Sequence, residues 1–373
     1  MPIKYQNTGT NSAGRKAIND LRFQVTGTAS SGRTDGSKVD HQTTGTTSVG
    51  RKNIWERALY FPRFVGVGAA YCYMSENGYD WTIVNPSWAG EHTNALLSVC
   101  YAPDKGILVA VGAPNLSFPT IIYSFNGVDW HPTTITGGFF SVCYAQNKGM
   151  FVAIGMGAIA TSTDGINWST TAYAQQPNKV LYNGTRFITH NGMNFMYSDN
   201  GLTWNNATGP TSYQPVYTLV PSTSDYKDAV AIATDASYSF YPAVRTTDGI
   251  SWSSEYTFSG QYTFVDICAT ENLIVAIGYD NTNPDNLVFL STGLSSPALW
   301  YPYLSTVDVT ASERPKRLYY SKETATLYAI TADGRVVTWY NPTSMGDITS
   351  GGTLSNATQD ALAITSVAII ESA

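Results

Sequence analysis

The chain has 373 residues, of which only 13% are charged, and it is rich in glycine, tyrosine and tryptophan (32, 25 and 9 residues). This composition suits tight turns and packed sheets, and no convincing amphipathic helix is found. No run of eighteen apolar residues occurs, so we expect no insertion into a membrane. Residues 1–6 lack the apolar core of a signal peptide, and we expect no secretion by that route.

Charge is spread unevenly. Residues 1–55 carry eight basic and three acidic residues, a net charge of +5, and the remainder carries 13 basic and 24 acidic residues, a net charge of −11. A basic arm on an acidic body suggests docking to an acidic surface, with a solvated, flexible tail as the alternative. The acidic body disfavours nucleic acid as a partner, although the arm could contact phosphates.

Residues 1–55 are dense in Gly, Ser, Thr and Asn, and such a segment cannot bury enough apolar surface to fold alone. Within it, residues 17–25 could add a strand to a partner or to the body. We therefore predict an extended polar arm over 1–55 that becomes ordered on assembly, followed by a folded domain over 56–373.

A short motif, Ser or Thr, any residue, Asn or Asp, Gly, two residues and Trp, recurs five times in the body. Its fixed positions are Ser75, Asn77, Gly78, Trp81; Ser124, Asn126, Gly127, Trp130; Ser162, Asp164, Gly165, Trp168; Ser198, Asn200, Gly201, Trp204; and Thr246, Asp248, Gly249, Trp252. Asn-Gly or Asp-Gly between apolar runs predicts a hairpin with a two-residue type I′ turn. The hydroxyl can bond backbone groups of the turn, and the Trp begins the returning strand with one N–H to satisfy.

Apolar runs before each motif predict the other strands. Residues 97–102 and 107–112 precede the second motif, 140–145 and 150–155 precede the third, and 264–269 and 273–278 form a later pair. Each unit thus holds four strands, and successive motif tryptophans lie 49, 38, 36 and 48 residues apart. Four antiparallel strands repeating at roughly 40–50 residues are typical of a β-propeller blade.

The pattern decays beyond Trp252. We expect a sixth blade with residues 287–290 as its third strand, a worn turn at 291–293, and Trp300 opening the fourth strand. A seventh blade has a turn at Asp333 and Gly334, and its missing fourth strand could come from residues 361–370, which would close the ring. The prediction is an all-β propeller of seven four-stranded blades, with six as the alternative.

The four cysteines, Cys72, Cys100, Cys143 and Cys268, form no C-x-x-C pair, so a zinc site is not expected. Cys100, Cys143 and Cys268 occupy the same position in the first strand of their units. We interpret all four as reduced, buried small hydrophobes.

The motif resembles the Asp-box, or BNR, repeat of sialidase-like propellers, with one residue fewer before the Trp. The resemblance implies a blade hairpin and leaves catalysis open, because the boxes of that family lie away from its active site. A sialidase-like enzyme would need three converging arginines, and the body offers Arg57, Arg63, Arg186, Arg245, Arg314, Arg317 and Arg335. No motif marks them, and the histidines His41, His92, His131 and His190 fit no metal or catalytic pattern, His190 falling in an apparent turn.

A low-charge propeller with a basic arm resembles structural proteins of tailed-bacteriophage virions. The resemblance implies a non-enzymatic tail or adhesion component, assembled in the bacterial cytoplasm. Its arm would anchor it to other tail subunits, and its propeller would meet a protein or a host glycan. We expect no catalytic, cofactor or metal residues. The rival hypothesis is a glycan-active enzyme or lectin of sialidase-like type, and convergence or scatter of the arginines distinguishes the two.

Overall fold

The structure is a computed structural model that describes residues 23–24, 41–42, 63–68, 71–84, 95–113, 119–174, 177–190, 194–209, 213–221, 229–235, 240–259, 262–280, 286–293, 301–308, 315–343, 353–354 and 364–370. The chain divides into two compact units, Met1–Phe61 and Pro62–Ala373. In the first unit, β1 (Phe23–Gln24) pairs in parallel with β2 (His41–Gln42). The ordering of residues 1–55 on assembly stays a prediction.

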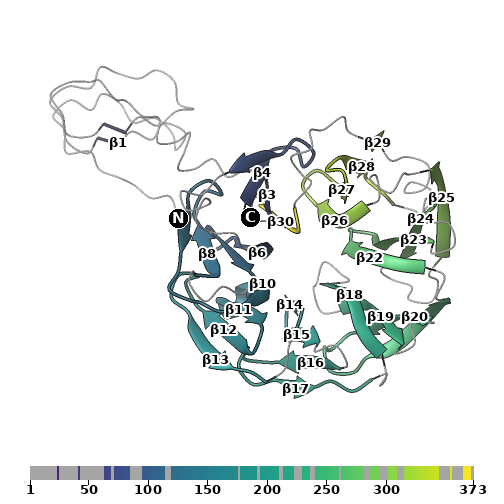
Figure 1. Cartoon of the computed structure of the whole chain (residues 1–373), viewed down its shortest axis with the longest axis horizontal. Helices are drawn as coiled ribbons and strands as arrows, with labels where there is room; N and C mark the ends of the chain where they lie inside the picture. Colours follow the sequence, from purple (N-terminus) through teal and green to yellow (C-terminus); the bar gives the residue numbers. More distant parts are fainter. Residues whose placement is uncertain are drawn as a thin grey trace. The chain divides into compact units, whose positions relative to one another are not determined.

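The second unit is a ring of four-stranded antiparallel sheets, seven of which are formed by the described residues (Figure 1). We number these blades in chain order and give their strands from the inside outward. Blades 1 to 4 are β30 (Ser366–Ile369), β3 (Phe64–Gly68), β4 (Tyr71–Ser75), β5 (Thr82–Val84); β6 (Leu96–Ala102), β7 (Ile107–Gly112), β8 (Ile121–Ser124), β9 (Trp130–Pro132); β10 (Phe139–Ala145), β11 (Met150–Gly155), β12 (Ala158–Ser162), β13 (Ser169–Ala172); and β14 (Val180–Tyr182), β15 (Phe187–His190), β16 (Phe195–Ser198), β17 (Asn205–Asn206). Blades 5 to 7 are β18 (Tyr213–Pro221), β19 (Ala229–Asp235), β20 (Phe240–Thr246), β21 (Ser253–Ser259); β22 (Tyr262–Ala269), β23 (Leu273–Asp280), β24 (Asn286–Gly293), β25 (Tyr301–Asp308); and β26 (Pro315–Ser321), β27 (Thr326–Thr331), β28 (Val336–Tyr340), β29 (Thr353–Leu354).

The all-β propeller expected from the sequence is confirmed. The inner strand of each blade lies beside that of the next, from β6 through β10, β14, β18, β22 and β26 to β30 and back to β6. Within the described ranges, one short 3-10 helix, η1 (Gln146–Lys148), lies between β10 and β11. No helix in the described ranges has the length and apolar character needed to span a membrane.

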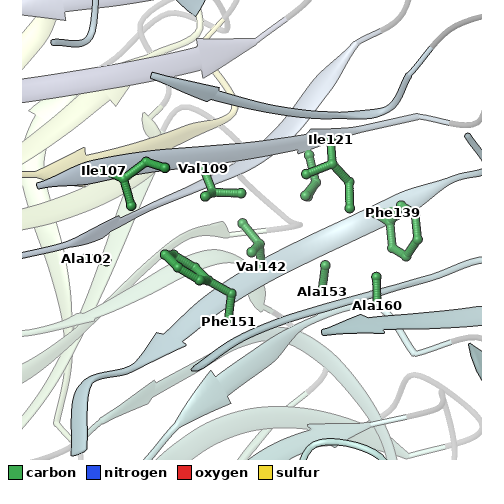
Figure 2. Packing of buried hydrophobic residues seen from close by; sticks show 10 residues of the cluster. Ala102, Ile107, Val109, Ile121, Phe139, Val142, Phe151, Ala153 and Ala160 are labelled. Atoms are coloured by element: carbon green, nitrogen blue, oxygen red, sulfur yellow. The ribbon is translucent and has the colours of Figure 1, made fainter. Parts of the chain in front are cut away.

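The core lies between neighbouring blades. The second strands β7 and β27 are buried at every residue, because each is covered on both faces. Figure 2 shows one such layer, in which Ile107 and Val109 of blade 2 pack toward Val142 and Phe151 of blade 3. Apolar and β-branched side chains on both faces of these strands therefore make each blade dependent on its neighbours.

Residues 366–369 close the ring in a different blade from the one expected. We anticipated that residues 361–370 would supply the fourth strand of the seventh blade, but that place is taken by β29, and β30 is the inner strand of blade 1. It pairs antiparallel with β3, from Phe64 opposite Ile369 to Val67 opposite Ser366. The chain end thus joins the first blade, so its strands come from both ends of the second unit. Residues 58–62 resemble residues 99–103 in sequence, which led us to interpret them as the opening strand of that blade; they lie outside the described residues.

The turns of the last two blades are partly as expected. Asp333 and Gly334 lie between β27 and β28, as predicted. The expected worn turn at 291–293 is wrong: these residues continue β24 and pair with β23, Ser291 lying opposite Val275. Ser291 and Thr292 can continue a strand, and Gly293 is tolerated because it lies at the end of the strand. Trp300 lies outside the described residues.

Candidate functional site

The five motifs form loops between the third and fourth strands of blades 1 to 5, here called the tip loops (75–81, 124–130, 162–168, 198–204 and 246–252). In each, the first hydroxyl accepts a hydrogen bond from the glycine N–H, at 2.8–2.9 Å. The same hydroxyl donates to the Asn or Asp side chain, at 3.0–3.2 Å. The hydroxyl therefore satisfies buried backbone at the base of the loop, as the sequence indicated.

The predicted type I′ turn is wrong. That turn needs positive φ at two successive residues, but only the glycine of each tip loop has it, with φ between +72° and +82°. The Asn or Asp instead uses its side-chain Oδ1 to accept the N–H groups two and three residues ahead, as Asn77 does from Tyr79 and Asp80 at 3.1 and 2.9 Å. The side chain thus takes the place of one backbone residue in the turn, and the loop that it closes is longer than a two-residue type I′ loop.

Asp and Asn both fit this position because each provides the oxygen, Oδ1, that accepts the N–H groups of the loop. Burial acts to raise the pKa of Asp164, but hydrogen bonds from the side chain and N–H of Asn167, the N–H of Ile166 and the hydroxyl of Ser162 outweigh it and lower the pKa to about 2. The same kinds of bond lower the pKa of Asp248. Each carboxylate thus stays an acceptor at neutral pH, as an amide oxygen does.

The motif tryptophans close four of the five loops. Trp81, Trp130, Trp168 and Trp204 donate from Nε1 to the carbonyl of their own tip glycine, at 3.0–3.2 Å. In the fifth loop, the buried Nε1 of Trp252 has no partner, and its ring stacks on Phe195 with centroids 3.9 Å apart. Stacking against the neighbouring blade there replaces the bond within the loop.

The tip glycines also face the preceding blade. A Cβ added to Gly201 would lie 2.7 Å from Val152 of blade 3, and one added to Gly249 would lie 3.1 Å from Arg186 and Ile188 of blade 4. Arg186 ties two tip loops together, since it donates to Asp199 at 2.9 Å and to the Asp248 carbonyl at 2.5 Å. The tip loops of blades 4 and 5 therefore pack directly against the blade before them.

We predict that Gly201→Ala destabilises the fold by about 1–2 kcal/mol more than Gly157→Ala. Both glycines have φ of +73°, so the backbone cost is shared, but nothing lies within 4 Å of a Cβ at Gly157. The difference therefore measures the overpacking against Val152, which typically costs ~1–3 kcal/mol. Urea unfolding of both variants checks it, and equal losses would contradict the close contact.

We predict that Ser162→Ala lowers the free energy of unfolding by about 2 kcal/mol, because it leaves the buried N–H of Gly165 without its acceptor. The neighbouring Thr163→Ala is the matched control, since Thr163 is exposed. Its expected effect is within ~0.5 kcal/mol of zero. A Ser162→Ala variant as stable as Thr163→Ala would mean that the hydroxyl does not support the loop.

A second repeated constellation lies near the start of the inner strands. We call it the polar ring: Ser366, Ser98, Ser141, Lys179, Asp266 and Arg317, one residue from each blade except blade 5, where the side chains of β18 are not described. Strand register shifts at Leu96/Ser98, Phe139/Ser141, Phe264/Asp266 and Pro315/Arg317 mark β-bulges beside four of them. A bulge re-aims the side chain that follows it.

Five members of the polar ring bind the inner strand of the next blade. The side chains of Ser366, Ser98, Ser141 and Asp266 accept the N–H groups of Val99, Val142, Val180 and Leu318, at 3.3, 3.2, 3.1 and 2.8 Å. Arg317 continues the series by donating from Nε to the Thr365 carbonyl at 2.6 Å. These bonds fix the blades relative to one another at their inner edges.

Sequence reasoning missed the polar ring. Its signal was a single polar residue before Val-Cys-Tyr at 98–101 and 141–144, and before Ile-Cys at 266–268. In these runs we interpreted only the cysteines and gave no role to the polar residue before them. Because the backbone groups that these side chains bind belong to the next blade, the partners could not be assigned from the local pattern.

Charge collects on one part of the polar ring. Burial lowers the pKa of Lys179. The charge of Asp266 opposes this effect, and the charge of Arg317 adds to it. His190 is a buried residue of β15 rather than part of a turn, and its Nδ1 has no partner. Burial, and then the charge of Lys179, lower the pKa of His190 to about 4.

Four arginines of the second unit have separate acceptors: Arg63 pairs with Glu323 at 3.2 Å, Arg186 with Asp199, Arg335 with Asp333 at 2.7 Å, and Arg317 with Thr365. Arg245 lies on β20 beside a tip loop, and Arg57 and Arg314 lie outside the described residues. The described arginines are thus distributed over blades 1, 4, 5 and 7, and the four pairs given above use four different acceptors.

The four cysteines are free. Cys100, Cys143 and Cys268 occupy equivalent places, opposite Val109, Val152 and Val275, and burial raises the pKa of each thiol. They pack against the hydrophobic clusters between blades. Over the described part of the chain, no three His, Cys, Asp or Glu residues are grouped so that they could hold a metal ion.

Comparison with known proteins gives the class of protein. No known family profile matches the sequence, and no curated protein matches it. Solved structures similar to the chain include an ancestral GH74 enzyme (TM-score 0.54, 13% identity, 80% of this chain and 46% of that one), and a functionally unknown protein from Desulfotomaculum acetoxidans (TM-score 0.57, 8% identity, 83% and 98%). A quinonprotein alcohol dehydrogenase-like protein from Bacteroides thetaiotaomicron is also similar (TM-score 0.54, 9% identity, 75% and 73%). This chain thus spans less than half of the GH74 enzyme. At these identities the likeness shows the fold alone, and the protein is a β-propeller.

Proposed function

We propose that this β-propeller is a non-enzymatic structural component of a tailed-phage virion, in the tail or adhesion apparatus. Residues 1–55 act as its anchor to other tail subunits, and the propeller serves as a platform for a protein or a host glycan. The observation that carries the proposal is the commitment of four of the described arginines and of the tip-loop hydroxyls to contacts within and between blades. Such a body is rigid and offers its surface for binding.

The tip loops suggest where a partner binds. In antiparallel blades, they lie at the same end as the turns between the first and second strands. Tyr79 and Phe125 are exposed on two of these loops, and Phe125 packs edge-on against Tyr123 at 5.7 Å between ring centroids. A supported, exposed aromatic ring suits the apolar face of a sugar or a partner's side chain.

Co-sedimentation with purified virions tests the proposal. We expect the full chain to co-sediment and a chain lacking residues 1–55 to remain in the supernatant, with tryptophan fluorescence showing that the truncated chain is folded. Full incorporation of the truncated chain would refute the anchoring role. Neutralising Arg15, Lys16 and Arg22 to glutamine in the full chain tests whether charge, rather than length, provides the anchor.

The rival activity is tested separately with a fluorogenic sialoside. The proposal predicts no turnover above a buffer blank. Robust turnover would identify a glycan-active enzyme and overturn the non-enzymatic function, whatever the co-sedimentation result.

A further inference from the structure

Lys179 is the exception in the polar ring. The other five members bind the backbone of the next blade, but among the described residues the Lys179 ammonium makes no hydrogen bond and no ion pair, although the side chain is only partly exposed. Its backbone is fixed on both sides: its carbonyl accepts the Thr189 hydroxyl at 2.7 Å, and the next N–H, of Val180, binds Ser141. The backbone that carries the Lys179 side chain is therefore held in place.

Among the described residues, the formally charged groups that act on Lys179 are one carboxylate and one guanidinium, so that with its own ammonium positive charge is in excess. Asp266 is the carboxylate that acts on it, and its two oxygens already accept the N–H groups of Ile267 and Leu318, at 3.0 and 2.8 Å. Arg317 is positively charged and disfavours the charged form of Lys179. Its Nε and Nη1 donate to the carbonyls of Thr365 and Lys316. The one carboxylate that favours the charged form of Lys179 among the described residues thus already accepts two backbone N–H groups.

His190 provides a second, independent sign of an unfilled contact. The side chain is 95% buried, and its Nδ1 has no hydrogen-bond partner. It interacts electrostatically with Lys179, and the Asn178 N–H reaches its carbonyl at 3.4 Å, so both residues belong to one corner of blade 4. A buried polar nitrogen without a partner costs free energy unless another group satisfies it.

We propose that Lys179 binds a small oxyanion, a carboxylate or phosphate group, at the inner edge of blade 4, with the charge of Arg317 in support and the Nδ1 of His190 beside it. An ammonium donates charge-assisted hydrogen bonds to such oxygens. A cation is disfavoured there by Lys179 and Arg317, and a neutral ligand would leave the excess charge uncompensated. The site is separate from the tip loops and does not depend on the proposed virion function.

Competitive labelling of lysine amines in the full chain tests the site without a mutation. The chain is modified with an amine reagent in inorganic phosphate, in glucuronate or in chloride at equal ionic strength, and labelling is read by peptide mass spectrometry. Lys105 is the internal comparator, since it lies in a turn beside Asp104 at 4.0 Å. We expect phosphate, glucuronate or both to reduce labelling of Lys179 severalfold relative to Lys105. Equal labelling of Lys179 in all three solutions overturns the proposal.

Titration calorimetry with the same two anions measures the contribution of the ammonium. Lys179→Met is expected to weaken binding about tenfold, the loss of one charge-assisted hydrogen bond, and Lys105→Met to leave it unchanged. Binding of phosphate alone identifies a phosphate site, and binding of glucuronate alone identifies a sugar-acid carboxylate; both support the proposal. Unaltered affinity in Lys179→Met, or equal losses in both variants, overturns it.

Discussion

A chain that ends at residue 360 is expected to lose its cooperative thermal unfolding transition and to aggregate. The truncation removes β30, and with it the ladder from Phe64–Ile369 to Val67–Ser366 and the flanking bonds of Thr365 and Ile370 at 2.7 and 2.8 Å. It also removes Ile364, which is 1% exposed and packs in the aromatic cluster between blades 7 and 1.

The expected loss is large because several contributions act together. Backbone hydrogen bonds contribute about 1 kcal/mol each, and a buried isoleucine about 2–3 kcal/mol. Their sum approaches the ~5–15 kcal/mol that holds a typical domain together. The truncation also exposes the edge of β3, whose residues are all buried, and a bare apolar edge pairs with other chains.

A chain ending at Ile370 is the matched control, because it keeps β30 and loses three residues. Circular dichroism melts and size-exclusion chromatography of the two truncations check the prediction. The ring-closing role of β30 is wrong if the shorter chain melts cooperatively within a few degrees of the longer one.

Between pH 6.5 and pH 4, the free energy of unfolding is expected to fall by about 3 kcal/mol as the pH is lowered. Burial, and then Lys179, lower the pKa of His190 from 6.5 to about 4 in the folded protein. Within this window the unfolded chain binds a proton that the folded protein refuses, so stability is present above pH 6.5 and is lost toward pH 4. The magnitude follows from ~1.4 kcal/mol per pKa unit.

Replacing His190 by asparagine should flatten this dependence within the window, whatever its effect on stability at neutral pH. His131→Asn is the control, since His131 is exposed on β9, and it should retain the slope. Urea unfolding in buffers without phosphate or carboxylate measures both. A His190→Asn variant with the slope of the wild type would show that the dependence arises from another group. The contribution of Asp164 is lost mainly below pH 4, as the pH falls from the ordinary pKa of 3.8 toward the folded pKa of about 2.

Interactions between residues close together in the sequence determined the tip loops and the blade strands. The tip loops could be found from the sequence because their hydrogen bonds join residues two or three apart, as from Ser162 to Gly165. The blade strands followed from apolar runs bounded by turn residues, and together they predicted the propeller. The turn type was missed because Asn and Asp tolerate positive φ, which suggested a backbone turn, whereas their side chains form the turn themselves.

Tertiary structure decided the rest, because it depends on contacts between residues far apart in the chain. Residues 361–370 carry strand propensity that fits any open edge, and only ring closure selects β3 over β28 as the partner of β30. In the same way, nothing local shows that Ser141 binds Val180 whereas the Lys179 ammonium binds no other described residue. The sequence by itself thus specified the repeated unit, and the packing of blade against blade selected the residues that face one another at the inner edge of the ring.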